Sequence, residues 1–132
     1  MTIALIAEDA KKELMVQFCI AYCGVLNHHS IIATSSTAKT VSEATGLSVT
    51  GFLGGSQGGT QQIASRIGYD EIDIVLLFRD TNNIKGPSED CNELLRLCDI
   101  HNIPVATNIA TAEVLIHGLE RGDLDWREIL KS

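Results

Sequence analysis

Residues 72–78 read Ile-Asp-Ile-Val-Leu-Leu-Phe, and this stretch decides the fold class of the chain. Apart from Asp73, every residue in it is apolar, and several are β-branched or aromatic. A near-continuous apolar strand is typical of a parallel sheet that helices cover on both faces, because neither face of the strand then meets water. We therefore expect a buried strand of a parallel sheet at 72–78.

Strand-like and helix-like segments alternate on both sides of this strand. Residues 11–22, for example, carry Leu14, Met15, Phe18 and Cys19 at helical spacing. Alternation of this kind predicts an α/β fold with helices on both faces of a mostly parallel sheet. Strands are expected at 2–7, 30–33, 48–52, 72–78 and 105–107, and helices at 11–22, 38–44, 60–67, 89–99, 111–119 and 126–130.

The composition limits the partners and the location that we expect. At 132 residues the chain is expected to form one domain, and its net charge of −7 argues against nucleic acid and anionic membrane as partners. No apolar run is long enough to span a membrane, and residues 3–7 do not make a signal peptide. The cysteines match no zinc template, so we expect small buried residues in a reducing cytosol: Cys19, Cys23, Cys91 and Cys98. No metal and no cofactor is expected.

Sheets of this type bind ligands at the carboxyl ends of their strands. That rule selects the segments 8–12, 34–37, 54–60, 79–90 and 108–111. The segment 51–62 is glycine-rich and reads as the end of a strand, a loop and the start of a helix, where backbone N–H groups can hold a phosphate.

Three of these segments allow two interpretations each. Asp9 is either an N-cap with Glu8 beside it, or part of a cleft in which Lys12 pairs with a phosphate. The hydroxyl run at 34–37 is either an ordinary N-cap or an anion cradle. The long segment 79–90 is either functional or simply the start of the next helix. The four histidines have no ligand spacing and are read as surface or structural residues.

Several segments, taken together in this order, resemble methylglyoxal synthase from residue 2 to about residue 129. The resemblance implies a single Rossmann-like three-layer α/β domain over residues 1–132, a homohexamer, and a cytoplasmic location. The segments that carry it are 3–7 with Asp9 and Lys12, 33–37, 43–47, Gly55 with Gly58, Gly59 and Gln61, Arg79 with Asp80, 94–97, 102–108 and 119–125.

The family's reaction converts dihydroxyacetone phosphate to methylglyoxal and inorganic phosphate. It needs a carboxylate base, donors for the developing oxyanion and a clamp on the phosphate. The resemblance places a phosphate clamp at Lys12, Thr34, Ser36, Thr37, Gly54 and Gly55, and family acids at Asp9, Asp80 and Asp90.

The same resemblance indicates three departures in the chemistry. Thr60 stands where the family has its catalytic aspartate, and Glu8 and Pro87 stand where it has histidines. A threonine hydroxyl cannot serve as a base near neutral pH, so we expect a protein that binds a small phosphorylated metabolite or phosphate with impaired or altered lyase chemistry. Three alternatives remain. The first is an active synthase with a relocated base, for which Glu8 is the candidate, and the second is phosphate elimination from another sugar phosphate with Glu8, Asp9 or Asp90 as base. The third is a non-catalytic phosphate-sensing regulator.

Overall fold

The structure is a computed structural model that describes residues 1–52, 58–82 and 89–131 of the chain. Within these ranges, a five-stranded sheet has the order β3–β2–β1–β4–β5, and every neighbouring pair is parallel. The parallel sheet expected from residues 72–78 is therefore confirmed. The strands are β1 (Thr2–Ala7), β2 (Ser30–Thr34), β3 (Val49–Phe52), β4 (Ile74–Phe78) and β5 (Val105–Ala106).

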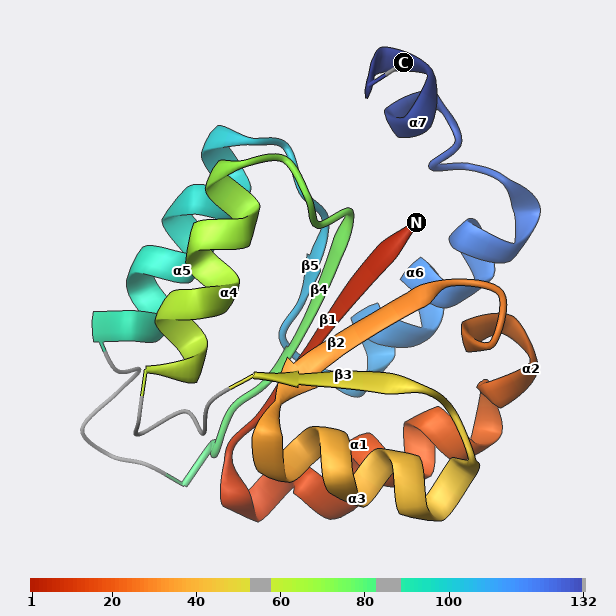
Figure 1. Cartoon of the computed structure of the whole chain (residues 1–132), viewed down its shortest axis with the longest axis vertical. Helices are drawn as coiled ribbons and strands as arrows, with labels where there is room; N and C mark the ends of the chain where they lie inside the picture. The colour runs from red at the N-terminus through yellow and green to blue at the C-terminus, as the bar shows by residue number, and fades with distance from the viewer. Residues whose placement is uncertain (53–57, 83–88, 132) are drawn as a thin grey trace.

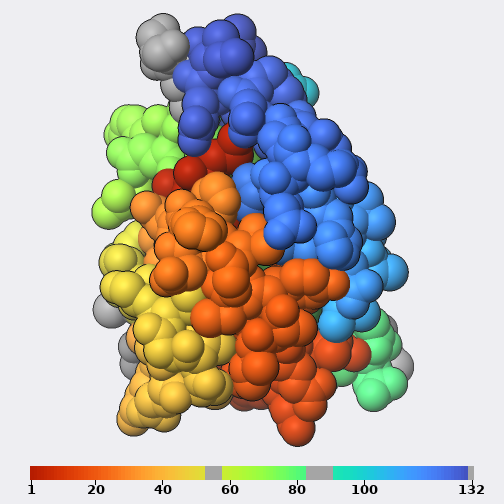
Figure 2. Space-filling view, turned by 90° about the vertical axis from the view of Figure 1, so that its right-hand side faces the viewer, coloured from red at the N-terminus to blue at the C-terminus, as the bar shows by residue number. Residues whose placement is uncertain are grey.

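Helices cover both faces of the sheet, as Figure 1 shows. On one face lie α1 (Lys12–Ala21), α3 (Ser35–Thr45) and α6 (Ile109–Arg121). On the other lie α4 (Gly59–Gly68) and α5 (Glu89–Ile100). Figure 2 shows the first face from outside, with α3, α1 and α6 covering it. The remaining elements are the 3₁₀ turn η1 (Asp9–Lys11), α2 (Cys23–Leu26) and α7 (Trp126–Lys131).

The alternation of side chains along β1, the central strand of the sheet, creates two hydrophobic cores, one on each face. Ile3 and Leu5 point into the core under α1, α3 and α6, whereas Ala4 and Ile6 point into the core under α4 and α5. The neighbouring β4 is buried at every position, which accounts for its continuous apolar sequence. Burial of each large aliphatic side chain contributes about 1.5–3 kcal/mol, so the sheet is held from both sides.

Several expectations about the ends of elements were wrong; the helix expected at 111–119, for example, spans Ile109–Arg121. The helix expected at 38–44 begins at Ser35, so the expected loop 34–37 is the N-cap Thr34 followed by the first helical turn. The strand expected at 72–78 begins only at Ile74. The helix expected to run to residue 22 breaks at Tyr22, and the short helix α2 follows it. Serine and threonine favour helix ends, and this preference concealed where α3 starts.

Candidate functional site

The carboxyl ends of four strands lie at one edge of the sheet. The register pairs Ala7 of β1 with Phe78 of β4, and Thr34 of β2 with Phe52 of β3. The segments that follow these strands therefore begin side by side. The chain runs outward from β1 through β2 to β3 and then returns to place β4 on the other side of β1. Parallel sheets bind ligands at such a reversal of strand order, which makes this edge the candidate functional site.

Glu8 and Asp80 meet at this reversal. The backbone N–H of Asp80 donates to Glu8 Oε1 at 2.7 Å, and the N–H of Glu8 donates to the carbonyl of Phe78 at 3.0 Å. Asp80 Oδ1 in turn accepts from the N–H of Asn82 at 2.9 Å. Glu8 and Asp80 are both half-buried. The structure thus joins the segment after β1 to the segment after β4 through one side chain.

Asp9 and Lys12 form an ion pair on the next turn of the chain. Lys12 Nζ donates to Asp9 Oδ1 at 2.7 Å, and the Asp9 side chain is 95% exposed. The expected N-cap at Asp9 is wrong, because Glu8 occupies the cap position of η1 and its side chain makes no capping bond. The hydrogen bond from Lys12, and secondarily its charge, lowers the pKa of Asp9. Asp9 is therefore a weaker base than an isolated aspartate.

The start of α3 presents hydroxyls beside the backbone N–H groups of its first turn. Thr34 is the N-cap, but its side chain makes no capping bond; instead its hydroxyl donates to Thr37 Oγ1 at 3.5 Å. Thr34 and Thr37 are buried, whereas Ser36 is exposed. The first N–H groups of a helix have no partner within the helix, and their dipoles favour an anion. This turn has the donor set that a phosphate requires.

The start of α4 also lies near the carboxyl end of β3, although α4 covers the opposite face of the sheet from α3 (Figure 1). Gly58 is its N-cap with φ of +98°, a conformation that favours glycine, and Thr60 is a buried residue of the first turn. Some predicted site residues lie outside the described residues. These are Gly54, Gly55 and Pro87, together with the side chain of Asp90.

Over residues 1–52, 58–82 and 89–131, no group of three or more His, Cys, Asp or Glu side chains is arranged to hold a metal ion. In the same part of the chain, no helix has the length and apolar character that a membrane crossing needs.

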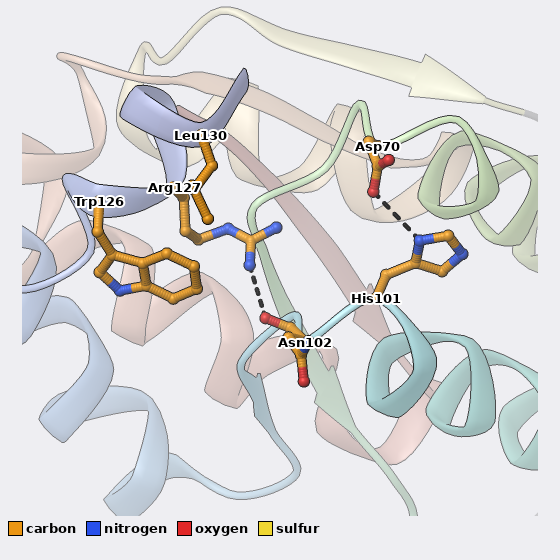
Figure 3. A pocket seen from close by; sticks show the side chains of 6 residues that line it. All are labelled: Asp70, His101, Asn102, Trp126, Arg127 and Leu130. Atoms are coloured by element: carbon orange, nitrogen blue, oxygen red, sulfur yellow. Dashed lines mark hydrogen bonds and ion pairs between the residues drawn. The ribbon is translucent and has the colours of Figure 1, made fainter. Parts of the chain in front are cut away.

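A cavity of about 210 Å³ lies at the opposite end of the sheet and was not anticipated from the sequence. Figure 3 shows Arg127 between Trp126 on one side and the Asp70–His101 ion pair on the other. Arg127 is buried and donates through Nη1 to the carbonyl of Asn102 at 2.6 Å. The residues that line the cavity precede β4 or β5 in the chain or belong to α7. The cavity therefore lies at the amino ends of the strands and is separate from the candidate site.

Comparison with known proteins agrees with the fold and its arrangement. The sequence profile of the MGS-like domain matches residues 15–107. The chain is 58% identical over 130 residues to the methylglyoxal synthase of Caldicellulosiruptor saccharolyticus, covering 98% of this chain and 92% of that protein. It is 51% identical over 132 residues to the methylglyoxal synthase of Oceanobacillus iheyensis, covering 100% of this chain and 94% of that one.

A solved structure extends the likeness to three dimensions. The crystal structure of methylglyoxal synthase from Elizabethkingia anophelis NUHP1 matches with a TM-score of 0.81 and 37% sequence identity. The match covers 87% of this chain and 76% of that chain. The solved structure agrees with the α/β fold described above. The sequence profile and the relatives show that this chain belongs to the MGS-like domain family.

Proposed function

We propose that the chain binds a small phosphorylated metabolite, such as dihydroxyacetone phosphate, or inorganic phosphate at the carboxyl edge of its sheet. The observation that carries the proposal is that two donor sets follow neighbouring parallel strands at that edge: Lys12 after β1, and the first turn of α3 after β2. The names of its relatives, which are methylglyoxal synthases, point to the same class of ligand. We assign the whole chain, residues 1–132, to one domain that acts as a cytoplasmic homohexamer.

In this proposal the phosphate occupies the start of α3. The N–H groups of the first turn and the hydroxyls of Thr34, Ser36 and Thr37 act as donors, and Lys12 supplies the positive charge. Gly54 and Gly55 complete the clamp. Lys12 Nζ already contacts Asp9 at 2.7 Å, so the phosphate must share the ammonium with that carboxylate.

The lyase chemistry is impaired or altered in our proposal. Removal of a proton beside a carbonyl needs a base, and loss of a general base costs about 10²–10⁴ in rate. Thr60 is buried in the first turn of α4, at the position that we equate with the family's aspartate.

Two alternatives are each favoured by one observation. Identity of 58% to a protein named methylglyoxal synthase favours an active enzyme whose base has moved to Glu8, Asp9 or Asp90. The threonine at position 60 favours a non-catalytic protein that senses phosphate. Asp9 is poorly suited to the role of base, because Lys12 lowers its pKa.

The decisive experiment measures methylglyoxal release from dihydroxyacetone phosphate by the wild-type protein and by Thr60→Asp. A carboxylate at position 60 is favourable to the helix, because the N-terminus of α4 carries a partial positive charge. We expect little or no turnover by the wild type and a gain in Thr60→Asp. Turnover by the wild type at the rate of an ordinary synthase would refute impaired chemistry and favour a relocated base. An inactive wild type that does not respond to phosphate would refute the binding proposal as well.

A further inference from the structure

Among the described residues, Glu8 makes three hydrogen bonds that join separate parts of the candidate site. Its N–H donates to Phe78 at the end of β4, and its carbonyl accepts from Lys11 at 2.8 Å, within η1. Its carboxylate accepts from the N–H of Asp80 at 2.7 Å. One residue is therefore fixed to β4, to η1 and to the segment that follows β4.

The elements that Glu8 joins carry charged groups of the candidate site. On one side η1 leads directly into α1, whose first residue is Lys12. On the other side the Asp80 backbone begins a turn in which its own carboxylate accepts from Asn82. Glu8 and Asp80 are 72 positions apart, so local geometry does not hold them together. The strand pairing of β1 with β4 and the Glu8 side chain do.

We propose that Glu8 is a positioning residue of this site rather than its base. Its carboxylate fixes the position of the Asp80 backbone relative to Lys12. In this proposal Lys12 contacts the phosphate and the Asp80 segment faces the carbon skeleton of the ligand, so Glu8 sets the distance between these two parts of the site. This role rests on the proposed binding of a phosphorylated metabolite. It needs an oxygen acceptor at position 8 but no proton transfer, because accepting the hydrogen bond from Asp80 N–H requires only a lone pair.

Two substitutions separate positioning from base chemistry. Glu8→Gln keeps a carbonyl oxygen that can accept from Asp80 N–H but cannot act as a base. Glu8→Ala removes the acceptor, and Glu13→Ala serves as control because it deletes an exposed acid nearby in α1. Misplacement of a group by about 1 Å costs up to about 10²-fold in an oriented site, so the effect on a ligand that spans the site is measurable.

The experiment combines hydrogen exchange with ligand binding. Exchange of the Asp80 amide, read by mass spectrometry with fragmentation, should accelerate about 10- to 100-fold in Glu8→Ala, since a bond to a charged acceptor is lost. It should stay near the wild-type rate in Glu8→Gln and Glu13→Ala. By calorimetry, Glu8→Ala should weaken dihydroxyacetone phosphate about tenfold or more and leave inorganic phosphate nearly unchanged, while Glu8→Gln binds both normally.

Each contrary result has a definite meaning. An unchanged Asp80 exchange rate in Glu8→Ala would overturn the positioning role alone. Equal loss of dihydroxyacetone phosphate in Glu8→Gln and Glu8→Ala would also overturn it, because the negative charge itself would then be needed. A wild-type protein that binds neither ligand would overturn the proposed function, and the positioning role with it.

Discussion

Asp73 and Arg127 form an ion pair that is buried at the amino-terminal edge of the sheet, with Arg127 Nε 3.4 Å from Asp73 Oδ1. The two side chains are only 6% and 5% exposed, respectively. Asp73 Oδ2 accepts from the N–H of Thr2 at 2.9 Å, and Arg127 also donates to the carbonyl of Asn102. Through this pair, α7 is attached to the start of β4 and to the turn before β5.

Replacement of Arg127 by methionine should lower the free energy of unfolding by about 3–5 kcal/mol, because it removes the Arg127 cation from its contact with the buried Asp73 carboxylate. Urea unfolding followed by circular dichroism measures the loss. The control is Arg121→Met, which breaks the exposed pair with Asp123 and should change stability by less than about 1 kcal/mol. Equal effects of the two substitutions would contradict the importance of burial.

Gly58 and Gly68 stand at the two ends of α4 and should respond to alanine in opposite directions. Gly58 has φ of +98°, and a Cβ there would lie 3.2 Å from Gln61 Oε1, so Gly58→Ala should destabilise the protein by about 1–3 kcal/mol. Gly68 has open space around it, and Gly68→Ala should stabilise by up to about 1 kcal/mol. Melting temperatures of the two variants, compared with wild type, test the contrast.

Lys12→Ala should abolish the thermal stabilisation that millimolar phosphate gives to the wild type. A ligand that binds only the folded state stabilises it by about 2.7 kcal/mol at a hundredfold excess over its Kd. Lys11→Ala removes the same charge from the preceding residue and should keep most of the shift. If both variants lost the shift equally, net charge rather than the position of Lys12 would account for phosphate binding.

The pKa of Asp9 should lie below its ordinary value in the wild type and return toward it in Lys12→Met, because Lys12 causes the shift. A carboxyl group whose pKa is lower in the folded protein than in the unfolded chain stabilises the fold. This stability is present above the unfolded pKa, about 3.9, and is lost as the pH falls through the folded pKa. Titration of the Asp9 carboxyl group by ¹³C NMR measures its pKa in the wild type and in Lys12→Met. The side chain is exposed, so about 1 M salt should reduce the shift, and Lys11→Met should leave it in place.

The fold was predictable because its signals are local. The apolar run before Phe78 identified a strand buried on both faces, and the alternation of segments identified the class of sheet. The cap of α3 was harder, because Thr34, Ser35 and Ser36 all favour a helix end and only the backbone decides among them.

The contacts that complete the site were not predictable, because they join distant residues. Nothing near Glu8 in the sequence indicates that it reaches Asp80, since that contact depends on β1 lying beside β4. Asp73 did carry a signal: a charged residue inside an apolar strand needs a buried partner. The sequence did not say that the partner is Arg127, 54 positions further on.

The central place of β1 in the sheet has a consequence for the order of folding. Its partners in β2 follow within a few tens of residues, but Ile3 pairs with Ile74, so the other edge of β1 stays open until β4 has been made. An apolar strand with an open edge is prone to join other chains. A sheet made of β1, β2 and β3 alone would leave that edge open, and the pairing of β4 with β1 both closes it and brings Asp80 to Glu8. The same strand pairing therefore covers an apolar edge and assembles part of the candidate site.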